Sequence, residues 1–125
     1  MDDGYLEKGL EQRKATLGAE YVDNVFANAD DFSRPFQEAM TAWCWGFGWG
    51  DDVFSPKMRS MLNLPMLAAL NRMEEFELHF RGAIRNGVTK DELRGLLHII
   101  SIYAGVPAGV SSFRIAKKVF AEEGM

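Results

Sequence analysis

The feature that most constrains the fold of this chain is the helical spacing of its apolar residues, which continues almost from end to end. These residues recur three and four positions apart, and glycine, proline or capping residues separate one run from the next. No segment reads as a β-strand with a turn partner. The sequence therefore predicts an all-α protein of six or seven helices, at about residues 6–17, 19–29, 32–47, 56–70, 71–87, 89–104 and 107–122.

Residues that commonly begin or end helices stand at these boundaries. The expected ends are, in order, Gly18 as a left-handed cap, Asp31 as an N-cap, Ser55-Pro56 as a cap followed by proline at the first helical position, the capping boxes Asn71/Glu74 and Thr89/Glu92, and Gly87 after the helix between them.

Two segments are expected to bury large apolar faces. In 32–47, an aromatic and methionine stripe ends in Trp43 and Phe47, so we expect Trp43 in the core, with a loop or broken turn over 46–52. The helix at 56–70 is apolar on every side from Met61 onward, and we expect it to be central and buried, with Pro65 bending it.

Length and charge narrow the classes of protein that remain. The chain has 125 residues, which fits one domain over 1–125. Its net charge of -4 and lack of clustered lysine and arginine argue against nucleic acid as a partner. The acidic N-terminus is unlike a leader, and the longest apolar stretch is too short to cross a membrane, so we expect a cytoplasmic protein.

The helix at 89–104 predicts a homo-oligomer. Leu93, Leu97 and Ile100 form one apolar stripe, whereas Ile99 and Ile102 lie well off it. A helix that is apolar on two sides in so small a protein suggests that one side faces another subunit. The alternative is a monomer whose core covers both faces.

Three polar residues of the helix at 71–87 are the strongest candidates for chemistry. At about 100° per residue, Arg72, Glu75 and His79 fall within one narrow sector, which they share with the apolar Phe76 and Ala83. An arginine at a helix N-terminus beside a histidine can hold a carboxylate and deliver a proton. The alternative is that Glu75 and His79 are a buried pair that only stabilises helix packing.

The remaining candidates are individually weaker. Trp45 and Trp49 either line a pocket or belong to the core. Cys44 is the only cysteine, so neither a disulfide nor a redox pair within the chain is possible, and we expect a packed, inert thiol. His98 is expected at an interface, and two histidines 19 residues apart make a poor metal site, so no metal is predicted.

Several motifs in a fixed order resemble the carboxymuconolactone decarboxylase family, within the superfamily of alkyl hydroperoxidase D-like helical oligomers. The resemblance covers about residues 9–122. It rests on Asp31-Phe32-x-Arg34-Pro35-Phe36, Cys44-Trp45-Gly46, Arg59-Ser60-x-Leu62-x-Leu64, Ala69-Leu70-Asn71-Arg72, Glu77-Leu78-His79-x-Arg81-Gly82-Ala83, Asn86-Gly87-Val88-Thr89 and Tyr103-Ala104-Gly105-Val106-Pro107-Ala108.

The resemblance implies an enzyme but excludes one kind of chemistry. His79, eight residues before Gly87, matches the histidine that follows the two redox cysteines of the hydroperoxidases, and those cysteines fall on Arg72 and Glu75. A thiol peroxidase is thereby excluded. What is implied instead is a carboxy-lyase without cofactor, which converts 4-carboxymuconolactone to the 3-oxoadipate enol-lactone in the protocatechuate branch of aromatic degradation. The family also suggests a trimer-based hexamer.

Within that expectation the residues take specific roles. His79 would return a proton, Arg72 would hold a substrate carboxylate, and Glu75 would position the imidazole and keep it protonated. Trp45, Trp49 and Tyr103 would bind the substrate within dry walls.

Two departures from the family pattern are visible. Alanine stands at 104, where cysteine is common, and Gly50-Asp51-Asp52 stands where an arginine often follows the tryptophan. The acidic pair would repel a second substrate carboxylate. It therefore leaves two alternatives open, a decarboxylase of a different lactone and a non-catalytic helical protein that binds a small ligand.

Overall fold

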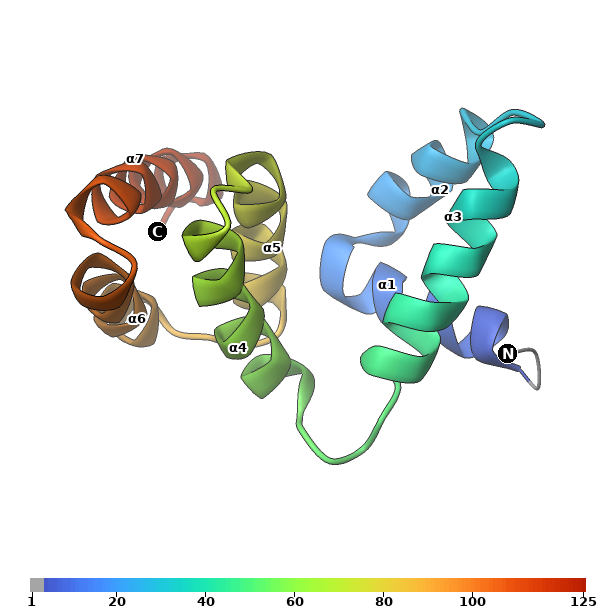
Figure 1. Ribbon diagram of the computed structural model, residues 1–125, viewed down its shortest axis with the longest axis horizontal. Helices are drawn as coiled ribbons and strands as arrows, with labels where there is room; N and C mark the ends of the chain where they lie inside the picture. Colours follow the sequence, from blue (N-terminus) through green and yellow to red (C-terminus); the bar gives the residue numbers. More distant parts are fainter. Residues whose placement is uncertain (1–3) are drawn as a thin grey trace. The chain divides into compact units, whose positions relative to one another are not determined.

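The computed structural model describes residues 4–125, and every regular element in this range is helical (Figure 1). The all-α prediction is confirmed. The elements are α1 (Tyr5–Leu17), α2 (Ala19–Ala27), α3 (Arg34–Met40), the π-helix η1 (Thr41–Gly48), α4 (Pro56–Ala69), α5 (Met73–Arg85), α6 (Lys90–Tyr103) and α7 (Val106–Glu123). They fall into two compact units, of which the first ends at Pro56 and the second begins at Lys57. The expectation of one domain over 1–125 stays a prediction.

In the first unit, α1 packs closely against η1. A side chain at Gly9 would collide with the backbone of Thr41, and one at Gly46 would collide with the backbone of Tyr5, so both contacts require glycine. Between these helices lies Arg13, which is 4% exposed and donates to the side-chain oxygens of Gln37 and Thr41. The buried arginine thus links α1 to η1 through neutral acceptors.

The π-helix overturns the expected aromatic face. Because its hydrogen bonds span five residues rather than four, side chains after Thr41 no longer follow the helical spacing of the sequence. Trp43, expected in the core, is 58% exposed and stacks on the half-exposed Phe47, whereas Trp45 is 3% exposed. The expected loop at 46–52 is also wrong in its first part, because η1 continues to Gly48.

The second unit has one apolar core, to which α4, α5, α6 and α7 all contribute. Its fully buried members include Leu64 of α4, Phe76 and Phe80 of α5, and Leu93 and Leu97 of α6. The helix α4 contains Pro65, as expected, and buries the face of Ser60, Leu64 and Ala68. It is not buried on every side, however, because Leu62, Met66 and Leu70 are exposed.

Helix ends follow the sequence where the signal is local. Gly87 has positive φ at the end of α5, and Thr89 and Glu92 form both bonds of a capping box. Three expected caps are wrong. Gly18 ends α1 with φ 93° and ψ 139°, which is not the left-handed helical conformation of the predicted cap. Asp30 rather than Asp31 accepts the backbone N–H groups before α3. Asn71 adopts φ 58°, a left-handed conformation that asparagine tolerates, so α5 begins after Arg72 without a capping box.

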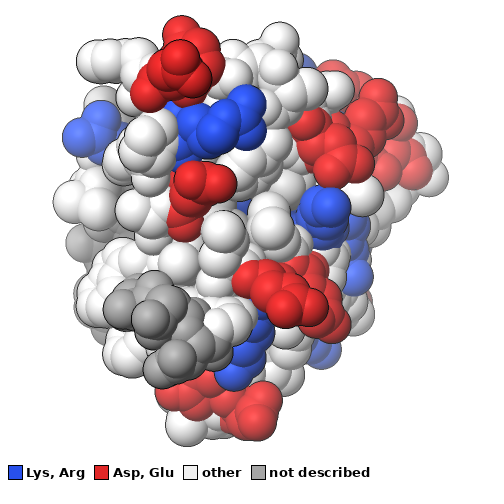
Figure 2. Space-filling view, turned by 90° about the vertical axis from the view of Figure 1, so that its right-hand side faces the viewer, with Lys and Arg blue, Asp and Glu red and all other residues white. Residues whose placement is uncertain are grey.

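Charge is mixed over the surface. Figure 2 shows one face on which lysine and arginine side chains stand among aspartate and glutamate side chains rather than forming one basic area. On α5, Glu77 and Arg81 form an ion pair at 3.1 Å, which extends to Lys118 and Glu122 of α7. Within 4–125, no helix is long and apolar enough to cross a bilayer.

Candidate active site

The three candidate residues, Arg72 just before α5 and Glu75 and His79 within it, do not share one environment. Phe76 and Ala83 are fully buried, as the helical spacing predicts, and His79 is partly buried beside them. Arg72 and Glu75 are exposed at the beginning of the helix. The polar residues of this face are therefore exposed at the beginning of the helix, whereas the histidine one turn later is partly buried beside the core.

His79 takes its neighbour from α4. Its Nδ1 lies 2.9 Å from Nδ2 of the Asn63 side chain. Desolvation by burial lowers the pKa of His79 from 6.5 to about 4, because the charged ring loses more hydration than the neutral one. The ring is therefore neutral at pH 7 in the free protein. Desolvation by burial is the cause of this shift, and the expected role of Glu75 toward the ring stays a prediction.

The beginning of α5 borders an open depression of about 490 Å³, lined by residues 71–75. The backbone N–H of Arg72 is bonded to Leu67, and that of Phe76 to Arg72. Residues 73–75 between them are in the first turn, whose N–H groups have no carbonyl of their own helix to bond. These donors and the Arg72 guanidinium favour an anion, whereas Glu74 and Glu75 oppose one.

The predicted substrate-binding residues lie in different units. Trp45 and Trp49 are in the first unit with ring centroids 4.7 Å apart, and Trp45 is buried. Tyr103, at the end of α6 in the second unit, is 84% exposed. Their roles in binding stay predictions.

The acidic departure from the family pattern has a local structural reason. A side chain at Gly50 would collide with the backbone of Gly46, so an arginine does not fit there. Asp51 accepts the backbone N–H of Val53 at 2.8 Å and so closes the turn before α4. The segment is therefore explained by packing and turn formation in the first unit.

The remaining candidates behave as structural groups. Burial raises the pKa of the Cys44 thiol, which agrees with the prediction of an inert cysteine. His98 is exposed and lies against Phe113, with ring centroids 5.9 Å apart. Over 4–125, no group of three or more histidine, cysteine, aspartate or glutamate side chains is arranged to hold a metal ion.

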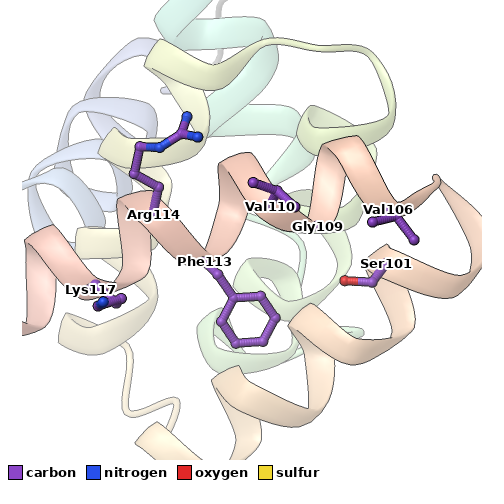
Figure 3. Close-up of a pocket in the computed structure, with 7 residues that line it drawn as sticks. All are labelled: Ser101, Val106, Gly109, Val110, Phe113, Arg114 and Lys117. Atoms are coloured by element: carbon purple, nitrogen blue, oxygen red, sulfur yellow. The ribbon is translucent and has the colours of Figure 1, made fainter.

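A second hollow lies between α6 and α7 (Figure 3). It measures about 440 Å³ and is lined by Ser101, Val106, Gly109, Val110, Phe113, Arg114 and Lys117. Gly109 allows the two helices to approach, because a side chain there would collide with Ser101. Two of its lining residues, Val106 and Val110, are 68% and 51% exposed, so apolar side chains lie open there in the single chain.

Together, the helical architecture and the histidine without redox cysteines define a class of helical enzyme distinct from the thiol peroxidases. The chain belongs to the carboxymuconolactone decarboxylase family, whose model matches residues 34–118. The family assignment made from the motifs is thereby confirmed.

Two curated relatives match most of the chain. It is 36% identical over 124 residues to a 4-carboxymuconolactone decarboxylase of Acinetobacter baylyi, covering 99% of this chain and 92% of the relative. It is 38% identical over 113 residues to a nitrosuccinic acid decarboxylase of Metarhizium robertsii, covering 90% and 79%. Both relatives are named as decarboxylases, in agreement with the predicted carboxy-lyase.

Sequence reasoning missed Asn63, the residue in contact with His79. An amide within a largely apolar helix segment was a usable signal, because a buried amide requires a hydrogen-bond partner. The identity of that partner was not visible, since it lies 16 residues away on another helix.

Proposed function

We propose that this chain is a cofactor-independent decarboxylase of small dicarboxylates, with 4-carboxymuconolactone as its first candidate substrate. The observation that carries the proposal is the arrangement on α5: an exposed arginine and free backbone donors at the helix start, then a partly buried, neutral histidine little more than one turn further along. This arrangement suits an anionic substrate that needs a proton at one end.

The substrates named for the two relatives have a common core. One is a lactone and the other a nitro acid. In both, a single carbon carries a carboxylate, a CH₂–carboxylate arm and an electron-withdrawing group. Both are therefore succinates substituted at one carbon, and the substituent differs. We propose that this core defines the substrate class, which keeps nitrosuccinate as the second candidate.

In this scheme the reaction needs no cofactor, because each substrate contains a group that accepts the electron pair left behind when CO₂ departs. When the bond between the substituted carbon and its carboxylate breaks, CO₂ leaves and the electron pair remains on that carbon. In the lactone it moves through the ring double bond to the lactone carbonyl oxygen, and in the nitro acid it moves to the nitro oxygens. One proton then adds to carbon, next to the carbonyl in the lactone and at the substituted carbon in the nitro acid.

The protein has two tasks in this scheme. Arg72 and the first-turn N–H groups of α5 hold the CH₂–carboxylate arm, which stays on the molecule. His79 supplies the proton that carbon receives after CO₂ has left. Glu75, one turn before His79, lies between these two groups along the helix and faces the bound arm as a like charge.

The neutral state of His79 fits this role once the substrate is bound. A dianion beside the ring favours the imidazolium, so binding raises the pKa of His79 from about 4 and draws a proton onto it. The proton taken up on binding is the one that the reaction consumes. In this scheme the substrate's charge protonates the ring, rather than the charge of Glu75.

The first test is CO₂ release from 4-carboxymuconolactone and from nitrosuccinate by three proteins: wild type, His79→Ala and, as matched control, His98→Ala. His98 is exposed and distant in sequence from the α5 site. We expect turnover of at least one acid by wild type and His98→Ala, and a loss of about 10²–10⁴-fold in His79→Ala. Circular dichroism checks that helical content is retained.

The other outcomes are equally informative. Full turnover by His79→Ala would remove the histidine from the mechanism. Absence of turnover of either acid, with saturable binding in calorimetry, would favour the alternative of a non-catalytic ligand-binding protein. Turnover of nitrosuccinate alone would keep the reaction and replace the substrate.

We further propose that the apolar face of α6 and α7 joins copies of the chain into a homo-oligomer, with a trimer or hexamer as the expected form. Exposed apolar side chains on these two helices support this proposal: Ile99 and Ile102 of α6 and Val106 and Val110 of α7 are all at least half exposed, and the two valines line the hollow of Figure 3. Sedimentation should show a smaller species for Ile102→Glu. Val53→Glu, at an exposed apolar residue of the first unit, is the control and should leave the assembly unchanged.

Two predictions accompany this function. The cytoplasmic location expected from the sequence remains one of them. The other is a role in the protocatechuate branch of aromatic degradation, which follows only if the lactone is the substrate.

A further inference from the structure

The contact between Asn63 and His79 joins two helices through two side chains that can each donate or accept a hydrogen bond. Asn63 is on α4 and His79 is on α5, and the two helices also meet where Asn86 donates to Ser60 at 3.0 Å. The Asn63 side chain presents its Nδ2 to the ring at 2.9 Å. An amide nitrogen only donates, so Nδ1 of the neutral ring is the acceptor and its proton is on Nε2.

The oxygen of the same amide makes no hydrogen bond in this state. Oδ1 of Asn63 is buried and has no hydrogen-bond partner among the described residues. Buried amide oxygens are almost always bonded, so an unbonded one beside a titratable ring requires an explanation. Its position on the side chain supplies one, because half a turn of the amide would bring Oδ1 to the place that Nδ2 now occupies.

Protonation of His79 makes that half turn necessary. In the imidazolium both ring nitrogens carry protons, so Nδ1 becomes a donor that faces the donor Nδ2. Rotation of the amide replaces this repulsion by an N–H···O bond to Oδ1. The same side chain then stabilises both states of the ring, each with the matching end of the amide.

We infer that Asn63 is a positioning residue whose amide turns with each protonation and deprotonation of His79, so that the ring holds one orientation while it takes up and releases a proton. This inference rests on the proposed function for its place in turnover, because the reaction scheme requires His79 to change its charge twice per cycle. The hydrogen-bond pattern of the free protein does not depend on that scheme.

Two substitutions at Asn63 separate the two states. Asn63→Leu removes both donor and acceptor, and we expect the neutral ring to lose its single tautomer. Asn63→Asp offers only an acceptor with a negative charge, and we expect His79 to be protonated at neutral pH. Asn86→Asp is the matched control, because it places the same change in another polar contact with α4, the bond to Ser60, and leaves the His79 contact unaltered.

The ¹⁵N and ¹H resonances of the His79 ring at neutral pH are the primary measurement, in the free full-length protein. Wild type and Asn86→Asp should show one neutral tautomer with its proton on Nε2, Asn63→Leu a mixture of tautomers, and Asn63→Asp protons on both nitrogens. A wild-type ring protonated on Nδ1, or a ring spectrum that neither Asn63 variant alters, would overturn the inference.

Steady-state rates on whichever acid the wild type converts are the second measurement. Asn63→Leu should lower kcat by roughly tenfold or more while KM changes little, as outer partners of functional histidines do elsewhere. Altered ring spectra with unchanged kcat would contradict the role in turnover. If wild type converts neither acid, the proposed function fails, and the ring spectra still decide whether Asn63 sets the tautomer.

Discussion

Two buried nitrogen-bearing side chains, Arg13 in the first unit and His79 in the second, meet similar surroundings and reach opposite charge states. Each contacts neutral partners, Gln37 and Thr41 for Arg13 and Asn63 for His79, and burial lowers the pKa of both. The guanidinium is so strongly basic that it stays charged even with a lowered pKa, whereas the pKa of the imidazole falls from 6.5 to about 4 and the ring is neutral.

The difference shows what burial does to groups of different basicity. Arg13 is a permanent cation, so the fold must supply acceptors and keep them in place. His79 avoids the cost of a buried charge by releasing its proton, and it can take one up when an anion arrives. The first group is therefore suited to fixing helices and the second to transferring protons.

The largest expected effect is on the free energy of unfolding, and it arises because folding keeps His79 neutral. The unfolded chain binds a proton at His79 below pH 6.5, whereas the folded chain does so only near pH 4. The contribution of His79 to the free energy of unfolding is therefore fully present above pH 6.5. It decreases by about 3 kcal/mol as the pH falls to 4. Urea unfolding at pH 7 and pH 4 measures this loss.

His79→Gln isolates that contribution, because glutamine does not titrate and the other groups do so in both proteins. The loss of stability between pH 7 and pH 4 should be about 3 kcal/mol smaller in the variant. Equal losses in the two proteins would mean that His79 is not held neutral, and the contrast with Arg13 would disappear.

The next effect is the pH dependence of the reaction. If the imidazolium returns the proton, kcat/KM follows the protonated fraction of the free enzyme and falls about 100-fold from pH 5 to pH 7, tenfold per unit above a pKa of about 4. In the complex, the substrate's charge raises the pKa of His79, so kcat should stay level over this range. A level kcat/KM would instead indicate that the neutral ring suffices.

How far the sequence predicts such features depends on the range of the interaction that fixes them. The capping box of Thr89 and Glu92 was predictable because both bonds lie within four residues. The box at Asn71 was wrong because a left-handed backbone there competes with the cap. Trp43 was wrongly expected in the core because the π-helix changes the period on which the prediction of a buried face depends, and Trp45 is buried there.

The candidate site divides in the same way. Its predicted place on α5 followed from the motifs and from helical spacing, and the family match confirms the family assignment made from those motifs. The contact of Asn63 with His79 and the lowered pKa arise from packing between two helices, and Arg13 owes its partners to packing against η1. Single-helix patterns contain no information about either.

A smaller effect is expected when the permanent cation is removed. Arg13→Met keeps much of the apolar stem and leaves the Gln37 and Thr41 oxygens without their donor, which should lower the free energy of unfolding by about 2 kcal/mol. Unfolding in urea at pH 7 measures it. An exposed arginine of the same chain, Arg94→Met, is the control and should change stability by less than about 0.5 kcal/mol, because its side chain is 62% exposed.

The smallest expected change in stability comes from removing one acceptor of Arg13 while the cation itself is kept. Thr41 is fully buried, and its Oγ1 accepts from Arg13 at 2.9 Å while donating to the Gln37 carbonyl at 2.6 Å. Thr41→Val keeps the shape and removes both bonds, but Gln37 still accepts from the guanidinium. We expect a loss of about 1 kcal/mol in urea unfolding, smaller than for Arg13→Met. A loss as large as that of Arg13→Met would mean that Thr41 alone holds the charge, and a stabilised variant would mean that the buried arginine does not need this acceptor.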